Sequence, residues 1–360
     1  MSCTTALALA CGALVGCAPP ADEAYQRYAG GTMGTGFRIQ AACDGALPVA
    51  AVDAALARVD AVFSTYRDDS ELSRLNARST SPEPQPVSAE LARVLSVAAA
   101  IARASGGALD PTVGPLVDRW GFGPAGVSAP PTPAAIADGL RGVGMAAVQI
   151  RRAPAPAAAD APAATGEHHL VAFTAPRRLD LSALAKGRGV DLVAEALQVG
   201  GCAHFLVDIG GEIRVRGRSP RGAPWRLGIE QPGALAPGYR PLPALVLTEG
   251  AVATSGDYRN YREVDGVRRS HLIDPRTGYP IAHALAAVTV WHPQTMHADA
   301  WATALNVLAP AEARETAERE GLVAAFLLRR SDGLFEPWRS SAFAERFEST
   351  DGDRVPGETL

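Results

Sequence analysis

The chain has 360 residues, of which 47% are apolar and 20% charged, and its formal net charge is -4 at pH 7. This length and apolar share suffice for a sizeable core in one large domain or two closely joined lobes. A nucleic-acid-binding protein would normally carry a basic excess, so the acidic balance argues against that class.

The N-terminus predicts export and lipid anchoring. An apolar run at Ala6–Val15 is too short to span a bilayer and is typical of a secretory signal. The tetrad LVGC (14–17) resembles a bacterial lipobox, so residues 1–16 are expected to be removed and Cys17 acylated. Two observations leave alternatives open. Cys3 and Cys11 lie in the same stretch, and no Lys or Arg precedes the apolar run, so the start codon could lie upstream.

Loss of Cys17 to lipid would leave Cys43 and Cys202. Export would permit a disulfide between them, but the sequence does not show that the geometry allows one. Residues 17–29 are interpreted as a linker. One lipid would tether the protein to a membrane that faces the periplasm or the cell exterior.

Hydrophobic periodicity predicts both helices and strands after residue 30. Helices are expected at 49–63, at 184–197, at 298–308 and at 311–320. Another is expected directly after Ser88, whose side chain could cap it. Strands are expected at 37–40, 170–173, 205–209, 213–216, 226–230, 244–248, 269–273, 286–291, 323–328 and 335–339. Runs of strands between groups of helices favour an α+β fold. We expect one catalytic domain at 30–347, with an Ala/Pro-rich insertion at 153–165 and a loose polar tail at 348–360.

Two glycine-rich segments could let backbone approach a ligand closely. They are GGTMGTG (30–36) and VDIGGE (207–212). Neither matches the dinucleotide or phosphate-loop fingerprints, and each alone is more often a hairpin turn.

The segment LDLSALAKG (179–187) places a cation near a predicted helix start. Ser182 could cap this helix, which would put Lys186 in its first turn, where the helix dipole disfavours a cation. A bound phosphate would explain this position, and a side chain that extends to solvent would explain it equally well.

An acidic and a hydroxyl residue share one helix face further along the chain. Asp299 and Thr303 are four residues apart, and their hard oxygen atoms suit Mg²⁺. The alternative is an Asp at a helix start and a Thr that bonds to its own helix. His271 ends a predicted strand and could be a general base, although a lone His is more often structural.

In chain order these segments resemble the FAD:protein FMN transferase family, also called the ApbE family. The matching stretches are TMGTGFRI (32–39), STYRDDSELSRLN (64–76), GALDPTVGPLVDRWGFG (107–123), LDLSALAKGRGVD (179–191), FLVDIGGEIRVRG (205–217), ATSGDYRNY (253–261), SHLIDPRTGYP (270–280) and HADAWATALNVL (297–308). The resemblance covers about residues 30 to 340. Ser182 stands where Gly is common, and Leu109 replaces a frequent Phe.

The resemblance implies a T-fold-like α+β body that binds FAD and uses Mg²⁺. The reaction would release AMP and join FMN to a Thr or Ser of a protein with a D-G-x-[ST]-G-[AST]-like motif. The implied metal ligands are Asp299, Thr303 and the carbonyl of Ala183. The implied catalytic residues are His271, as the base, and Lys186, which would add positive charge at the diphosphate. The implied FAD contacts are Met33, Tyr66, Ala108, Leu109, Asp110, Asp180, Lys186 and Ile273.

Two other functions stay open. An FAD pyrophosphatase would use the same site with water in place of the protein hydroxyl. A non-catalytic flavin-binding lipoprotein would need neither a metal ligand pair nor a base.

Overall fold

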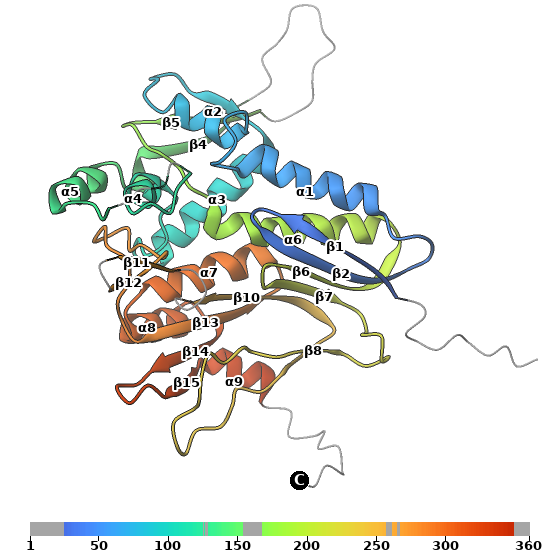
Figure 1. Cartoon of the computed structure of the whole chain (residues 1–360). Coiled ribbons are helices and arrows are strands. Elements are labelled where there is room, and N and C mark those ends of the chain that lie inside the picture. The colour runs from blue at the N-terminus through green and yellow to red at the C-terminus, as the bar shows by residue number, and fades with distance from the viewer. Residues whose placement is uncertain are drawn as a thin grey trace, which may run out of the picture.

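The computed structural model describes residues 25–124, 126, 129–153, 168–256, 261–264 and 267–348. Its centre is an eight-stranded sheet with the order β1-β2-β6-β7-β10-β13-β14-β15, in which every neighbouring pair is antiparallel. Helices cover the sheet and the strands come in runs, which confirms the predicted α+β class (Figure 1).

The bounds of the elements are as follows. The strands are β1 (Gln26–Thr32), β2 (Thr35–Cys43), β3 (Gln85–Val87), β4 (Val148–Ala153), β5 (His168–Phe173), β6 (Cys202–Ile209), β7 (Glu212–Arg216), β8 (Trp225–Leu227), β9 (Leu245–Leu247), β10 (Glu249–Gly256), β11 (Tyr261–Val264), β12 (Val267–Ser270), β13 (Leu285–His292), β14 (Val323–Arg329) and β15 (Phe335–Arg339). The helices are α1 (Val49–Phe63), α2 (Glu71–Ala77), α3 (Ala89–Ala104), α4 (Gly114–Arg119), α5 (Pro133–Arg141), α6 (Ser182–Val199), α7 (Thr295–Val307), α8 (Pro310–Arg319) and α9 (Ser341–Phe347), with short 3-10 helices at Pro111–Val113 and Met145–Ala147.

Helices α6 and α7 lie side by side on one face of the large sheet, and α1 and α3 lie above them (Figure 1). The apolar side chains of α1 recur at helical spacing, and Val52, Leu56 and Val59 are buried against this layer. The Oγ of Ser88 accepts the N–H of Leu91, which confirms the predicted cap of α3. This helical layer holds the largest core cluster.

The other face of the sheet has its own apolar core. Trp225 of β8, Leu247 of β9 and Phe343 of α9 pack there against residues of β7, β10 and β14. Because both faces are covered, the central strand β10 is buried along most of its length. This strand is absent from the sequence prediction, since its residues EGAVATSG are small and show no alternation. Strand pairing on both sides determines its conformation.

The predicted linker at 17–29 is wrong for its last residues. Gln26–Ala29 belong to β1, which pairs with β2 along its full length. Its side chains are mostly exposed, so the segment carries no hydrophobic signal, and backbone pairing at the sheet edge makes it a strand. Cys17, residues 154–165 and residues 349–360 lie outside the described residues, and so do the predictions that concern them.

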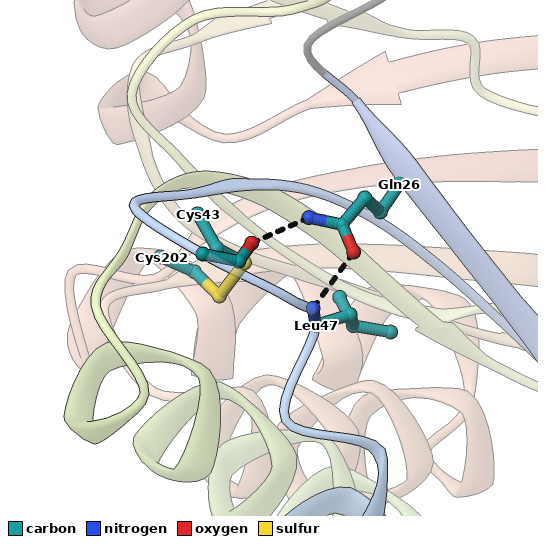
Figure 2. The surroundings of a disulfide bond; sticks show 5 residues. Gln26, Cys43, Leu47 and Cys202 are labelled. Atoms are coloured by element: carbon teal, nitrogen blue, oxygen red, sulfur yellow. Dashed lines mark hydrogen bonds between the residues drawn. A yellow bond between two sulfur atoms is a disulfide. The ribbon is translucent and has the colours of Figure 1, made fainter.

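A disulfide joins Cys43 at the end of β2 to Cys202 at the start of β6 (Figure 2). The side chain of Gln26 braces the adjoining loop, because it donates to the Gly45 carbonyl and accepts the N–H of Leu47. The pairing left open by the sequence is thus formed in the structure. Among the described helices, none has the length and apolarity needed to cross a membrane.

Candidate active site

A cavity of about 930 Å³ lies beside α6 and α7. It is lined by every site residue that the sequence predicts within the described chain. These are Met33, Tyr66, Ala108, Leu109, Asp110, Asp180, Ala183, Lys186, His271, Ile273, Asp299 and Thr303. They come from segments that are distant in the sequence, and the fold brings all of them to one place.

Asp299 and Thr303 line the cavity from one face of α7, as their spacing predicts. Asp299 is only 2% exposed, and its Oδ2 accepts the backbone N–H of Gly187 at 2.9 Å. The hydroxyl of Thr303 lies 3.2 Å from the hydroxyl of Ser255 in β10. The pair therefore presents a carboxylate and a hydroxyl to the cavity, held by neighbouring elements.

Lys186 of α6 is the only lysine in the chain. Its Nζ lies 3.0 Å from Oε1 of Glu212 and 3.5 Å from Oδ1 of Asp299. Burial alone would lower the pKa of Lys186, but the charges of Asp299 and Glu212 raise it above its ordinary value. The amine therefore stays protonated, which places a fixed positive charge in the cavity.

Glu212 is a site residue that the sequence analysis missed. It begins β7, directly after the Gly210-Gly211 turn, and is 3% exposed. Burial raises its pKa to about 7, although the charge of Lys186 opposes the shift. Its Oε2 is buried and has no hydrogen-bond partner in the described chain. An acidic residue after a glycine pair is a turn signal, and nothing in its sequence neighbourhood points to Lys186.

The start of α6 differs from the prediction. The residue before the first turn is Leu181, and no side chain caps the helix. Ser182 is not the cap, since its own N–H donates to Oδ1 of Asp180 at 2.8 Å. Lys186 therefore lies beyond the first turn. Two carboxylates account for its position, and the helix dipole does not decide it.

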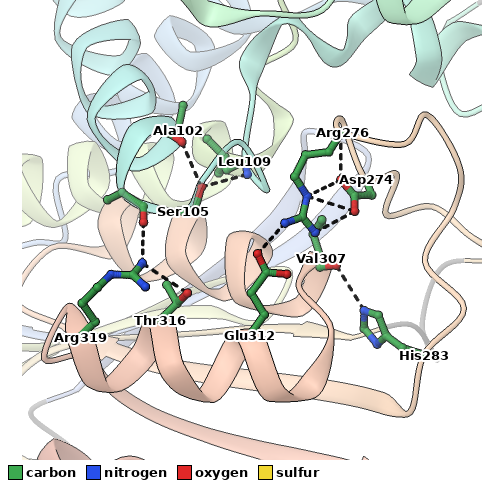
Figure 3. Close-up of polar contacts among 11 residues, drawn as sticks. Ala102, Ser105, Leu109, Asp274, Arg276, His283, Val307, Glu312, Thr316 and Arg319 are labelled. Atoms are coloured by element: carbon green, nitrogen blue, oxygen red, sulfur yellow. Dashed lines mark hydrogen bonds and ion pairs between the residues drawn. The ribbon is translucent and has the colours of Figure 1, made fainter. Parts of the chain in front are cut away.

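The loop from Ala108 to Asp110 forms another wall of the cavity. The N–H of Leu109 donates to Oγ of Ser105, which in turn contacts the carbonyl of Ala102 (Figure 3). Both oxygens of Asp110 accept hydrogen bonds within the protein, from Thr112 and from the N–H of Met145. The carboxylate of Asp110 thus fixes the loop that lines the cavity.

His271 follows β12 directly and lines the cavity, as does Ile273. The adjoining turn is fixed to α8 by Arg276, which pairs with Asp274 and with Glu312 (Figure 3). This bracing holds the segment that carries His271 against the helical layer. A histidine in the wall of the cavity that Lys186 and Asp299 also line is a candidate general base.

Met33 and Tyr66 complete the lining. Met33 occupies the turn between β1 and β2 with φ of 47°, a left-handed conformation that is uncommon outside glycine. Tyr66 is 71% exposed, and its hydroxyl donates to the Phe122 carbonyl at 3.3 Å. An exposed aromatic ring beside a cavity offers a flat apolar surface for a planar ligand.

Comparison with known proteins gives a consistent result. The model of the ApbE family matches residues 33–327. The chain is 39% identical to the FAD:protein FMN transferase of Haemophilus influenzae, over 89% of this chain and 91% of that protein. It is also 39% identical to the Vibrio cholerae protein of the same name, over 92% and 94% of the two chains.

Solved structures agree in fold. The apo flavinyl transferase ApbE of Pseudomonas stutzeri aligns with a TM-score of 0.77 and 34% identity, over 90% of this chain and 96% of that chain. The flavin transferase ApbE of Vibrio cholerae aligns with a TM-score of 0.76 and 36% identity, over 90% and 99% of the chains. The chain therefore belongs to the ApbE family.

Proposed function

We propose that the protein is an FAD:protein FMN transferase that uses Mg²⁺. It would cleave the diphosphate of FAD, release AMP and attach FMN to a Thr or Ser of an acceptor protein. One observation carries this proposal. A single cavity of about 930 Å³ is lined by Lys186, His271 and the Asp299/Thr303 pair. This volume is in the range of pockets that bind small molecules and cofactors. The curated relatives bear the name of this activity.

The residues around Asp299 fit a hard cation. Two buried carboxylates, Asp299 and Glu212, share the single ammonium of Lys186, so ionised they carry an excess of negative charge. Burial raises the pKa of both acids, because the charge of Lys186 does not fully offset the loss of hydration of the two carboxylates. No cluster of three His, Cys, Asp or Glu suited to a metal occurs in the described part of the chain. A cation would be held by Asp299, Thr303 and the carbonyl of Ala183, an oxygen set typical of Mg²⁺.

When bound, Mg²⁺ would neutralise phosphate charge and stabilise the AMP leaving group. Lys186, which lines the cavity, would add a fixed positive charge beside the diphosphate. The acceptor hydroxyl attacks the phosphorus on the FMN side, the bond to AMP breaks, and His271 takes the hydroxyl proton. The loop at 108–110 and the ring of Tyr66 would bind and orient the rest of FAD.

We further propose that the protein acts outside the cytoplasm, anchored through lipid on Cys17. The disulfide between Cys43 and Cys202 supports export, because such bonds persist mainly in oxidising compartments. The acceptor would then be an exported protein that carries a D-G-x-[ST]-G-[AST]-like motif.

The test uses the purified protein with FAD, Mg²⁺ and a protein that carries the acceptor motif. Intact-mass spectrometry follows the acceptor, and chromatography follows AMP and FMN. We expect the acceptor to gain the mass of one FMN. An Asp299→Ala variant should lose at least about a hundredfold in rate, as expected when a catalytic group is removed.

Each outcome separates the candidate functions. Labelling that needs Mg²⁺ and Asp299 supports the transferase. Release of AMP and free FMN without labelling of several motif-bearing acceptors supports a pyrophosphatase. FAD that binds but stays intact in every sample contradicts catalysis and supports a binding protein.

A further inference from the structure

One backbone amide links the two helices that carry the proposed cation ligands. Gly187 of α6 donates its N–H to Oδ2 of Asp299 on α7 at 2.9 Å, in a buried position. Among the described residues, the other oxygen, Oδ1, has only the longer contact with Nζ of Lys186, at 3.5 Å. The two oxygens of Asp299 are therefore unequal, because one is fixed by rigid backbone and the other faces a flexible amine.

Gly187 also lies at a close contact between α6 and α7. A Cβ built there would lie 2.6 Å from the carbonyl oxygen of Thr295, and 2.8 Å from both Cα of Met296 and Cβ of Asp299. Such distances are far below van der Waals contact, and two of these atoms belong to helix backbone. Any side chain at 187 would push the helices apart, since packed interiors leave little room to relax.

The same amide bears on Ala183. In a regular helix the N–H of residue 187 would bond the carbonyl of residue 183, four positions earlier. Because this N–H donates to Asp299, it can form at most a weaker, bifurcated hydrogen bond with the carbonyl of Ala183. The carbonyl of Ala183, which lines the cavity, thus keeps acceptor capacity for a cation.

We propose that Gly187 is the positioning residue of the cation site. Its N–H orients Asp299 and leaves the carbonyl of Ala183 able to accept another partner. Its lack of a side chain lets α6 and α7 approach closely enough for a carboxylate oxygen of Asp299 and the carbonyl oxygen of Ala183 to bind one ion. This inference rests on the proposed function, because it presupposes that Mg²⁺ binds at Asp299. Removal of a residue that orients a metal ligand typically costs about 10–100-fold in metal affinity.

The first test measures Mg²⁺ affinity directly, by calorimetric titration of the purified protein, without turnover. Gly187→Ala should weaken Mg²⁺ binding about 10–100-fold. Gly139→Ala is the control, because an added Cβ at Gly139 of α5 would also meet a neighbouring helix, 2.8 Å from Cδ2 of Leu116. The control should bind Mg²⁺ within about twofold of the original protein, by the additivity expected of distant sites.

A second test does not depend on the folding of the Gly187 variant. Lys186 is the only lysine, so carbonyl-¹³C lysine with ¹⁵N glycine yields one amide signal in a carbonyl-correlated NMR spectrum, that of Gly187. We expect its proton to move upfield in Asp299→Ala, because the charge-assisted hydrogen bond is lost.

The outcomes distinguish this inference from the proposed function. If the original protein binds no Mg²⁺, the proposed function fails and the inference falls with it. If the original protein binds Mg²⁺ and Gly187→Ala binds it equally well, only the inference is refuted. The same holds if the amide proton shift of Gly187 does not change in Asp299→Ala. Weaker binding in Gly187→Ala alone, with an upfield shift, supports it.

Discussion

Replacement of Glu212 by Gln should change how the stability of the metal-free protein depends on pH. Burial raises the pKa of Glu212 from 4.5 to about 7. The native state therefore holds a proton that the unfolded state has released, so stability falls as pH rises between these two values. Gln resembles the protonated acid in shape and cannot ionise, so Glu212→Gln removes this dependence.

The size of the effect follows from the shift. One pKa unit corresponds to about 1.4 kcal/mol, so ionised Glu212 costs the native protein about 3 kcal/mol well above pH 7. Between pH 5 and pH 8 the free energy of unfolding of Glu212→Gln should gain about 2–3 kcal/mol relative to the original protein. The Glu212 side chain is 4% exposed, so screening by solvent changes this value little.

Urea unfolding followed by tryptophan fluorescence, with a chelator present, measures the effect at several pH values. The difference between the two proteins should be smallest at pH 5 and largest at pH 8. Parallel stability curves would refute the reasoning, because they would show that Glu212 titrates alike in the native and unfolded states. Glu195→Gln, at a half-exposed position of α6, is a control for loss of one carboxylate.

Three further predictions concern the scaffold. Burial lowers the pKa of the stacked imidazoles of His292 and His297, so the unfolded state binds more protons and stability should fall as pH drops below 6.5. Acid unfolding should show a smaller loss of stability when both residues are replaced by Gln. Reduction of the Cys43–Cys202 disulfide, which closes 159 residues, should lower the free energy of unfolding by about 3–5 kcal/mol, and an unchanged denaturation midpoint would contradict this. The buried carboxylate of Asp191 in α6 accepts two N–H groups at the start of α7 and pairs with the partly buried guanidinium of Arg214. Asp191→Ala should therefore lower the free energy of unfolding by about 3–5 kcal/mol in urea unfolding, and Asp191→Asn should be intermediate.

The predicted site agrees with the structure where local spacing was enough. Asp299 and Thr303 share a helix face because residues four apart always do. The strand predicted at 269–273 is shifted, since β12 spans Val267–Ser270 and His271 follows its end. The family resemblance supplied the rest of the cavity lining. Asp110 differs in detail. Its carboxylate caps the short 3-10 helix through the N–H of Thr112, which is a local interaction, but it also accepts the N–H of Met145, 35 residues away.

The sequence by itself determined the amphipathic helices, the alternating strands, the capping of α3 and the identity of the reactive side chains. These features depend on neighbours within a few residues. Only the tertiary structure decided that β1 and β10 are strands, that Glu212 meets Lys186, and that Gly187 bonds Asp299. Each of these depends on a partner from another part of the chain. Strand pairing, burial and close approach are properties of the folded chain, so a local sequence pattern cannot predict them.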